Sequence, residues 1–176
     1  MDKPGNQTGF EYANKRAKEM RKYAEREAKD RKMRQVGATV EKYFGSNAPL
    51  ISAMLGNIDV ETGGTFDYRQ KQKDGDGYGL FQFDFHRPYY FKFLKENRLE
   101  DSADSQVRYV HENIFGSQQK VLGEGNADDL RKAFESDDPI YLSDSIMNIF
   151  LNPGVPHADR RRESTRMHSF AITPAR

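Results

Sequence analysis

The chain contains no cysteine among its 176 residues. This absence excludes a disulfide scaffold, a thiol nucleophile and a cysteine-ligated zinc or iron–sulfur site. No apolar run approaches the roughly 20 residues that a membrane-spanning helix needs, and the first residues, MDKPGNQTG, lack the apolar segment of a secretory signal. We therefore expect a soluble protein, made in a cytoplasm and without a membrane span.

Hydrophobic residues are also few, at 36% of the chain against 31% charged residues. The net charge of +1 conceals an asymmetry, because residues 10–35 carry ten Lys or Arg against five Asp or Glu. This segment contains no Gly or Pro and is rich in strong helix formers. The sequence predicts a charged helical arm over residues 1–36, which Gly37 ends, and a separate domain over residues 37–176.

The apolar stripe of this arm is narrow, since it consists mainly of alanines at three- and four-residue steps: Ala13, Ala17, Met20, Ala24 and Ala28. Such a seam buries little area, so the helix either lies on a partner or extends into solvent. Three interpretations remain open. The arm is a solvated extension, it docks on another protein of an assembly, or it contacts nucleic acid or another polyanion.

Helical periodicity dominates the rest of the sequence. Ser46-Asn47-Ala48-Pro49 is typical of a helix start, and the apolar residues of LISAMLGNIDVET follow at helical spacing. Further helices are predicted over residues 88–98, 102–122, 127–135, 139–151 and 158–167. Residues 65–78 carry little periodicity and predict a short β-hairpin or a long loop. The expected fold class is mainly α, or α+β with this one small excursion.

Glu61 ends the first of these helices, one turn after Asn57, and two glycines follow it. Its carboxyl group is expected near the buried face, partly desolvated, beside the open mouth that the glycine turn leaves. Desolvation and the negative end of the helix dipole both favour a protonated carboxyl group. Such a group can act as a general acid on a glycosidic oxygen. The alternative is an ordinary exposed glutamate near a helix end.

A second candidate segment is Tyr78-Gly79-Leu80-Phe81-Gln82-Phe83. Gly79 permits a close backbone approach, and Gln82 offers both a donor and an acceptor. Aromatic side chains can form stacking walls for the apolar faces of sugar rings. By itself, the segment is more typical of a buried strand or turn.

Together, the blocks LGNIDVETGGTF and DGDGYGLFQF, followed by Arg87, resemble the phage tail lysozyme family of the lysozyme-like superfamily. That family shows a GN-I-x-x-E-S/T-G helix end, then YGL-x-Q-W and an arginine. The block DSQVRYV and the block NPGVP with the arginines at 160–162 extend the resemblance over about residues 40–170. The pairing of the glutamate with GL-x-Q is also similar to goose-type lysozymes and soluble lytic transglycosylases.

The resemblance implies that Glu61 is the catalytic acid on a MurNAc–GlcNAc linkage of peptidoglycan. It also implies a substrate cleft formed by Asn57, Tyr78, Gly79, Leu80, Gln82, Phe83 and Arg87. Phe83 stands where the family has tryptophan, and Thr62 where it commonly has serine. For Arg87, a structural salt bridge is an equally good interpretation.

A second carboxylate is needed only by one of two possible reactions. An inverting hydrolase places a base roughly 6.5–9.5 Å from the acid, whereas a lytic transglycosylase uses no second carboxylate. Asp67, Asp74, Asp76 and Asp84 are candidates. Asp74 and Asp76 rank first as catalytic partners of Glu61, because their loop is expected to face the cleft.

No metal or other cofactor is expected. The run KDGDGYG resembles part of a calcium loop, but an EF-hand needs a glutamate at loop position twelve, where this chain has Phe83 or Phe85. The four histidines lack the HExxH spacing of a zinc site.

The sequence thus predicts a virion-associated muramidase that locally degrades the cell wall during phage infection. Its partners would be peptidoglycan and, through the arm, other tail or ejection proteins of the virion; nucleic acid is not an expected partner. The alternatives are a structural tail or adaptor subunit with a lysozyme-like fold, and a free endolysin.

Overall fold

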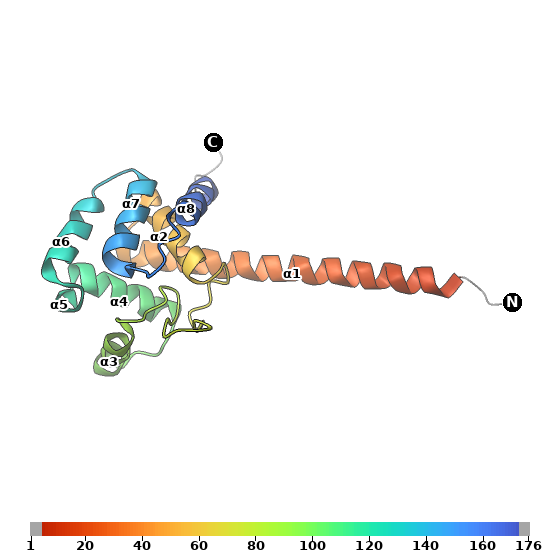
Figure 1. Ribbon diagram of the computed structural model, residues 1–176, viewed down its shortest axis with the longest axis horizontal. Coiled ribbons are helices and arrows are strands. Elements are labelled where there is room, and N and C mark those ends of the chain that lie inside the picture. The colour runs from red at the N-terminus through yellow and green to blue at the C-terminus, as the bar shows by residue number, and fades with distance from the viewer. Residues whose placement is uncertain (1–4, 173–176) are drawn as a thin grey trace.

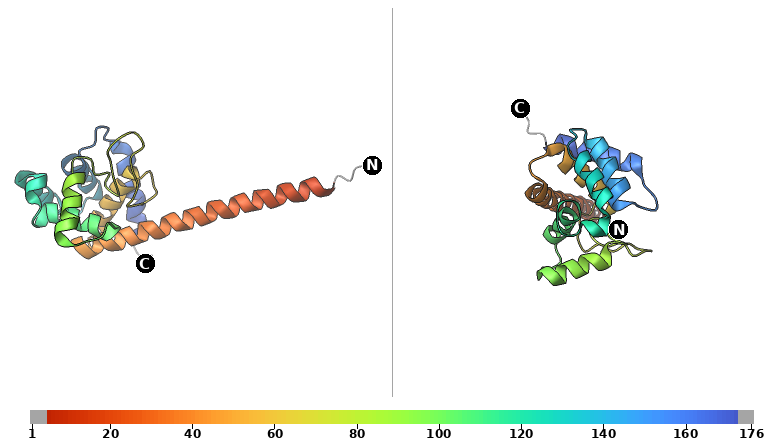
Figure 2. Two further views of the ribbon diagram at one scale, coloured as in Figure 1. Left: turned by 90° about the horizontal axis from the view of Figure 1, so that it is seen from below. Right: turned by 90° about the vertical axis from the view of Figure 1, so that its left-hand side faces the viewer.

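The computed structural model describes residues 5–172 of the chain and the side chains of residues 10–169. Helix α1 (Gly5–Phe44) is continuous, and its N-terminal part extends far beyond the domain (Figure 1). The left view in Figure 2 shows the same projection, and the right view looks along α1. This continuous helix confirms the long N-terminal helix that the sequence predicts. The side chains of its residues 10–29 are exposed.

The prediction that Gly37 ends this helix is wrong, because α1 continues for seven more residues to Phe44. Its last turns belong to the domain, since Val36 and Val40 are buried in the core. Gly37 itself faces Leu55. Burial of two valines outweighs the roughly 1 kcal/mol that a glycine costs inside a helix.

Helix α2 (Ala48–Glu61) lies at the centre of the domain and is buried from Leu50 to Ile58. It starts where the sequence predicts: the Asn47 side chain accepts a hydrogen bond from the N–H of Leu50 (3.0 Å), and Pro49 occupies the first turn. Helix α8 (Ala158–Ile172) crosses α2 closely at Gly56, where an added Cβ atom would lie 2.8 Å from the Thr165 Cα atom.

The other helices lie to the left of this pair and below it (Figure 1). They are α3 (Arg87–Asn97), α4 (Ala103–Phe115), α5 (Gln119–Leu122), α6 (Glu124–Ala133), α7 (Pro139–Ser145) and the π-helical segment η1 (Ile146–Leu151). Two predicted helices are each divided in the structure. The first breaks at Gly116, and the second changes to π-helix and ends at Asn152, which has a left-handed backbone (φ 39°).

The fold is mainly α, as the sequence predicts. Between α2 and α3 the chain forms a long loop, in which the one β-bridge among the described residues pairs Lys71 with Tyr78. Two backbone hydrogen bonds flank this bridge, from Gln72 to Gly77 and from Gly79 to Gln70, each 2.8 Å long. The predicted excursion is therefore a loop with one hairpin-like turn. Within residues 5–172, none of the helices combines the length and the apolar character that crossing a membrane requires.

Aromatic rings fill the core beneath this loop. The Phe83 ring packs against Tyr90 (centroids 5.2 Å apart) and Tyr109 (5.5 Å), and the His86 ring stacks on Phe150 at 4.8 Å. His86 Nδ1 lies 3.2 Å from the Tyr109 hydroxyl. Burial of the imidazole lowers the pKa of His86 from 6.5 to about 4, because the apolar surroundings disfavour its charged form.

We predict that this core loses stability in mild acid. An unfolded His86 takes up a proton near pH 6.5, whereas the folded protein resists protonation down to about pH 4. The unfolded state therefore binds more protons between these pH values, and the free energy of unfolding should fall by up to about 3 kcal/mol as the pH drops through this window.

Urea unfolding between pH 7 and pH 4 measures this loss. His86→Gln should remove a large part of the pH dependence, and His157→Gln, at an exposed position, should retain it. Equal pH dependence in the wild type and His86→Gln would contradict the prediction.

Candidate active site

Glu61 is the last residue of α2, and the turn after it is held firmly. The Thr62 hydroxyl donates to the Ile58 carbonyl (2.8 Å) and accepts from the N–H of Phe66 (3.1 Å). Gly63 and Gly64 both have positive φ, at 57° and 82°, a backbone conformation that glycine adopts without strain. The turn therefore leads the chain away from the helix end and leaves the Glu61 side chain at the rim of a cleft, with 13% of it exposed.

A buried arginine binds this carboxyl group. Arg161 Nη2 donates to Glu61 Oε1 (2.7 Å), Nη1 donates to Asn57 Oδ1 (3.1 Å), and Nε donates to the Pro156 carbonyl (2.7 Å). The Arg161 side chain is only 2% exposed. A cation that is taken out of water needs such partners to offset its lost hydration, so these three bonds fix the position of Glu61 relative to α8.

Asn57 supports this arrangement from inside the core. Its Nδ2 donates to the Ala53 carbonyl (3.0 Å) and to both the carbonyl and the hydroxyl of Ser143 (3.1 Å each). The residue is completely buried. Asn57 therefore orients Arg161 and connects α2 with α7, and it lies behind the cleft surface.

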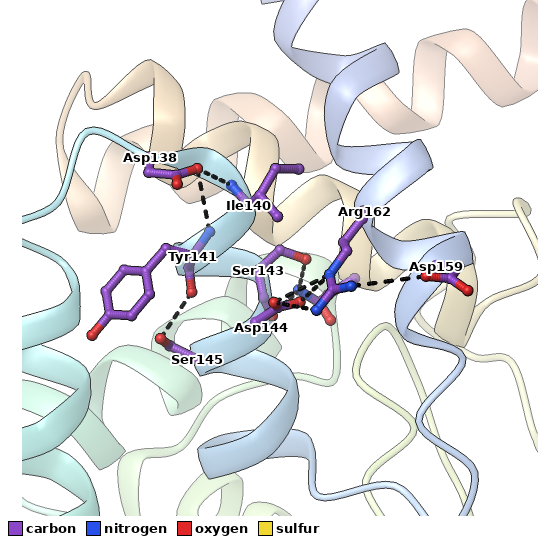
Figure 3. Close-up of polar contacts among 9 residues, drawn as sticks. Asp138, Ile140, Tyr141, Ser143, Asp144, Ser145, Asp159 and Arg162 are labelled. Atoms are coloured by element: carbon purple, nitrogen blue, oxygen red, sulfur yellow. Dashed lines mark hydrogen bonds and ion pairs between the residues drawn. The ribbon is translucent and has the colours of Figure 1, made fainter.

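Arg162, the next residue, binds α7 instead of α2. Its guanidinium binds both Asp144 oxygens, with Nη2 2.8 Å from Oδ2, and approaches Asp159 at 3.8 Å (Figure 3). This pair joins α7 to α8 beside Ser143, so it holds α8 in the rotation that turns Arg161 inward.

The cleft has a volume of about 650 Å³. Glu61 and Arg161 form one part of its wall, and the loop between α2 and α3 and the segment between η1 and α8 form the rest. The lining residues are Val60, Glu61, Gln72, Gly75, Asp76, Phe81, Gln82, Asp84, Leu151, Asn152, Pro153, Gly154, Val155, His157 and Arg161.

Backbone strain concentrates at this cleft. Three of its lining residues, Gln82, Asn152 and His157, have positive φ angles of 45°, 39° and 48°. Residues other than glycine rarely adopt a positive φ. Such a backbone conformation persists where the surrounding contacts enforce it. Such strain is typical of functional sites.

Gln82 presents its side chain to the cleft from a tight turn. Its Nε2 donates to the Gly79 carbonyl (2.8 Å), so the amide oxygen is the atom best placed to accept a bond from a ligand. Gly79 has φ 80°, and a Cβ atom there would lie 2.6 Å from Gln106 Nε2. Glycine is therefore required at this position for both conformation and space.

Gln106, which is completely buried in α4, clamps this turn. Its Oε1 accepts from the N–H of Leu80 (2.8 Å), and its Nε2 donates to the Tyr68 carbonyl (2.7 Å) and to Asp101 (3.2 Å). Gln106 lies in the block DSQVRYV, and its position in the sequence indicates no role for it. Its spacing from Gly79 along the chain carries no signal of this contact.

The other proposed cleft residues lie behind the lining. Leu80 and Phe83 are buried in the core. The Tyr78 hydroxyl donates to Asp101, and burial together with this carboxylate raises the pKa of Tyr78 to about 12. The Arg87 guanidinium covers the Tyr78 ring (5.6 Å) and donates to the Asp76 carbonyl (3.3 Å). In this structure these side chains shape the loop that carries Gln82.

Only two of the four candidate second carboxylates line the cleft. Asp76 and Asp84 are exposed and line the cleft, whereas exposed Asp74 is not part of its lining. Asp67 lies on the α1 side, where its Oδ1 accepts from the N–H of Arg69 (3.0 Å) and its Oδ2 lies 3.3 Å from Lys32 Nζ. These bonds hold the pKa of Asp67 below its ordinary value.

Arg161 is a site residue that the sequence pattern alone does not single out. Three consecutive arginines made the choice ambiguous, and only the rotation of α8 resolves it. In the structure, Arg161, Ser164, Thr165 and His168 are buried at the i, i+3, i+4 and i+7 spacing of one helix face. All four are polar, so a search for apolar periodicity passes over them. Among the residues that the structure describes, no group of three His, Asp or Glu side chains could hold a metal ion.

We predict that Arg161→Ala destabilises the protein by about 3–5 kcal/mol, because it leaves the largely buried Glu61 carboxylate and the Asn57 amide without their partner. Chemical denaturation at pH 7 measures the change. Arg162→Ala is the matched control: this arginine is 40% exposed, so a much smaller loss is expected. A similar loss in both variants would contradict a special role for Arg161.

Comparison with known proteins accords with this geometry. The sequence profile of the phage tail lysozyme family matches residues 33–168, a range that includes the last turns of α1, Glu61, the Gln82 turn and Arg161. No curated protein and no solved structure gives a significant match. The matched range covers most of the chain and supports peptidoglycan as the substrate, cleaved by a hydrolase or a transglycosylase. The chain belongs to the phage tail lysozyme family.

Proposed function

We propose that the chain is a muramidase that cleaves the MurNAc–GlcNAc bond of peptidoglycan, with Glu61 as its general acid. The observation that carries this proposal is the position of Glu61 on the wall of a 650 Å³ cleft, held by buried Arg161. A glycan strand in this cleft would meet a carboxyl group whose orientation is fixed before the substrate binds. Such positioning is a main source of catalytic rate.

Arg161 Nη2 lies 2.7 Å from Glu61 Oε1 and holds the carboxyl group in place. The proposed reaction uses the protonated form of this carboxyl group. The proton would then pass from Glu61 to the bridging oxygen as the glycosidic bond breaks.

Asp76 is the stronger candidate for a second carboxylate, because it lines the cleft and Asp74 does not. In an inverting hydrolysis, Asp76 would take a proton from the attacking water on the far side of the sugar ring. Asp84, which also lines the cleft, is an alternative base. A lytic transglycosylase would need neither, since the sugar itself closes onto the anomeric carbon.

The arm supports a location in the phage particle, in the tail or among the ejected proteins. Residues 10–29, about five and a half helical turns, are exposed on all sides. They nevertheless carry Phe10, Tyr12, Met20 and Tyr23, with 63–69% of each residue exposed. Exposed large apolar side chains at this density favour contact with a partner over a purely solvated helix. We infer that the arm attaches the enzyme to another virion protein.

We predict that Glu61→Gln lowers the rate of peptidoglycan cleavage by about 10²–10⁴-fold, the usual contribution of a general acid. Mass spectrometry of the soluble products from purified peptidoglycan gives both the rate and the reaction type. Reducing MurNAc ends identify hydrolysis, and anhydro-MurNAc ends identify a lytic transglycosylase.

Asp74→Asn and Asp76→Asn form a matched pair for the second carboxylate. If the products show hydrolysis with Asp76 as base, Asp76→Asn loses activity and Asp74→Asn retains it. Unchanged cleavage by Glu61→Gln would refute the proposed acid. If the wild-type protein is inactive under conditions where a reference muramidase is active, the result would favour the alternative that the chain is a structural tail or adaptor subunit.

We predict that removing residues 1–28 separates catalysis from assembly. This deletion spares Lys29, which pairs with Asp59 (3.5 Å), and the buried residues Val36 and Val40, so the domain should keep its stability and its rate of peptidoglycan cleavage. Incorporation into phage particles, measured by immunoblotting of purified virions, should be lost. Normal incorporation of the truncated chain would contradict a tethering role for the arm.

A further inference from the structure

The exposed arm, residues 10–29 of α1, is divided lengthwise into two chemically different halves. With about 3.6 residues per helical turn, every apolar residue of the arm falls on one half of the helix surface. This apolar half comprises Phe10, Tyr12, Ala13, Ala17, Met20, Tyr23, Ala24 and Ala28. The other half, the charged half, carries six Lys or Arg, three Glu and one Asn. The arm is therefore an amphipathic helix that projects from the domain (Figure 1).

The apolar half faces away from the domain. Arg31 and Gln35 continue its helix face from Ala28 by steps of three and four residues, and both are exposed. The side of α1 that packs on the domain carries instead Val36 and Val40, which are buried. Only a separate molecule can therefore take the apolar half out of water.

The shape of the apolar half fits a second helix. Its four alanines recur one and two turns apart and leave shallow positions between larger side chains. A facing helix can approach closely there, because the side chains at the contact set the distance between two helix axes. A lipid surface is a poorer match, since membrane binding scales with the buried apolar area and alanine adds little.

Two charged residues within the apolar half favour a second copy of the same arm in antiparallel orientation. Arg16 lies toward one end of this half and Glu27 toward the other, and the Tyr23 hydroxyl donates to Glu27 Oε1 (3.2 Å). Antiparallel pairing brings Arg16 of each arm to the end of the other arm that carries Tyr23 and Glu27. The arginine then meets an aromatic ring and an opposite charge. Parallel pairing would instead bring like charges together.

The same orientation sets large side chains against small ones. If Ala13 lies beside Ala24 of the second copy, Ala17 lies beside Met20 and Phe10 lies near Ala28. Each contact occurs twice, because a two-fold interface uses the same surface of both copies. The charged halves then face outward on both sides of the pair, so their excess of positive charge stays in water.

We propose that the apolar half of the arm is a dimer interface, in which the arms of two copies of the chain pair antiparallel along residues 10–28. This inference rests on the proposed tethering role and narrows it: the protein that this face binds in the particle is a second copy of the enzyme. The two catalytic domains lie at opposite ends of the paired arms, and the charged halves stay available to other virion proteins. Because alanines bury little area, we expect a micromolar rather than a nanomolar Kd.

Sedimentation equilibrium of the full-length chain, from about 1 μM to about 1 mM, measures this pairing. We expect a shift from monomer to dimer as the concentration rises. Met20→Glu should raise the Kd by at least about tenfold, because pairing would bury an uncompensated charge. Lys22→Gln is the matched control: it changes the net charge by the same amount on the charged half and should leave the Kd unchanged.

Disulfide formation tests the orientation of the arms. The chain has no cysteine of its own, so single introduced cysteines report only the designed contact. In an equal mixture of Ala13→Cys and Ala24→Cys, antiparallel pairing should give almost only the mixed disulfide. Lys18→Cys, on the charged half, should give no disulfide in the same time. Disulfides within each variant in place of the mixed one would overturn the antiparallel pairing.

The outcomes separate the dimer from the tethering role. If the wild type stays monomeric up to about 1 mM and Met20→Glu is missing from purified virions, a different protein binds the apolar half. The dimer is then wrong and the tethering role stands. If the wild type stays monomeric and Met20→Glu enters virions normally, both the dimer and the apolar contact behind the tethering role are overturned.

Two further results would overturn the dimer interface. A dimer that Met20→Glu does not weaken has its interface elsewhere. A monomer that binds phosphatidylglycerol vesicles, and loses this binding in Met20→Glu, uses the apolar half on a lipid surface instead.

Discussion

The guanidinium of Arg161 is the group on which the candidate site depends. Its charge is almost fully buried, and its three bonds end on the α2 carboxylate, the α2 amide and the carbonyl of Pro156 in the cleft wall. Two partners lie one turn apart on α2 and the third lies in the segment before α8, so these bonds to one buried cation position the acid, the core amide and the cleft wall together. A hydrophobic contact could not do this, because it has no preferred direction.

Gln106 fixes the loop that carries Gln82, as Arg161 fixes Glu61. It bonds to the backbone of Leu80 and Tyr68, and the absence of a side chain at Gly79 gives it the space to do so. Arg161 and Gln106 are both polar side chains that are buried on helices. Each binds backbone groups of a loop, and Arg161 also binds the side chains of Glu61 and Asn57. Helical scaffolds hold such groups more rigidly than loops can. The result is a cleft whose walls are loops but whose anchors are helices.

Helix α1 combines two roles that its composition alone does not separate. Its last turns belong to the core through Val36 and Val40, and salt bridges from Lys29 and Lys32 hold the next turns against Asp59 and Asp67. The remaining turns extend freely (Figure 2). Because the helix is continuous, a load on the arm is transmitted to the domain next to α2. In the proposed tethering role, this rigidity would hold the domain in one orientation.

The sequence determined the helical class, the start of α2 at Asn47 and the place of Glu61 at the end of that helix, because caps, periodicity and glycine turns act over a few residues. It also indicated the Gln82 turn. The tertiary structure decided what lies across the cleft: which of three arginines faces inward, that Asp76 and not Asp74 lines the wall, and that Phe83 packs in the core. Tertiary packing of Val36 and Val40 also let α1 continue beyond Gly37. These outcomes depend on helix rotation and on contacts between segments up to 104 residues apart, which local chemical preference does not encode.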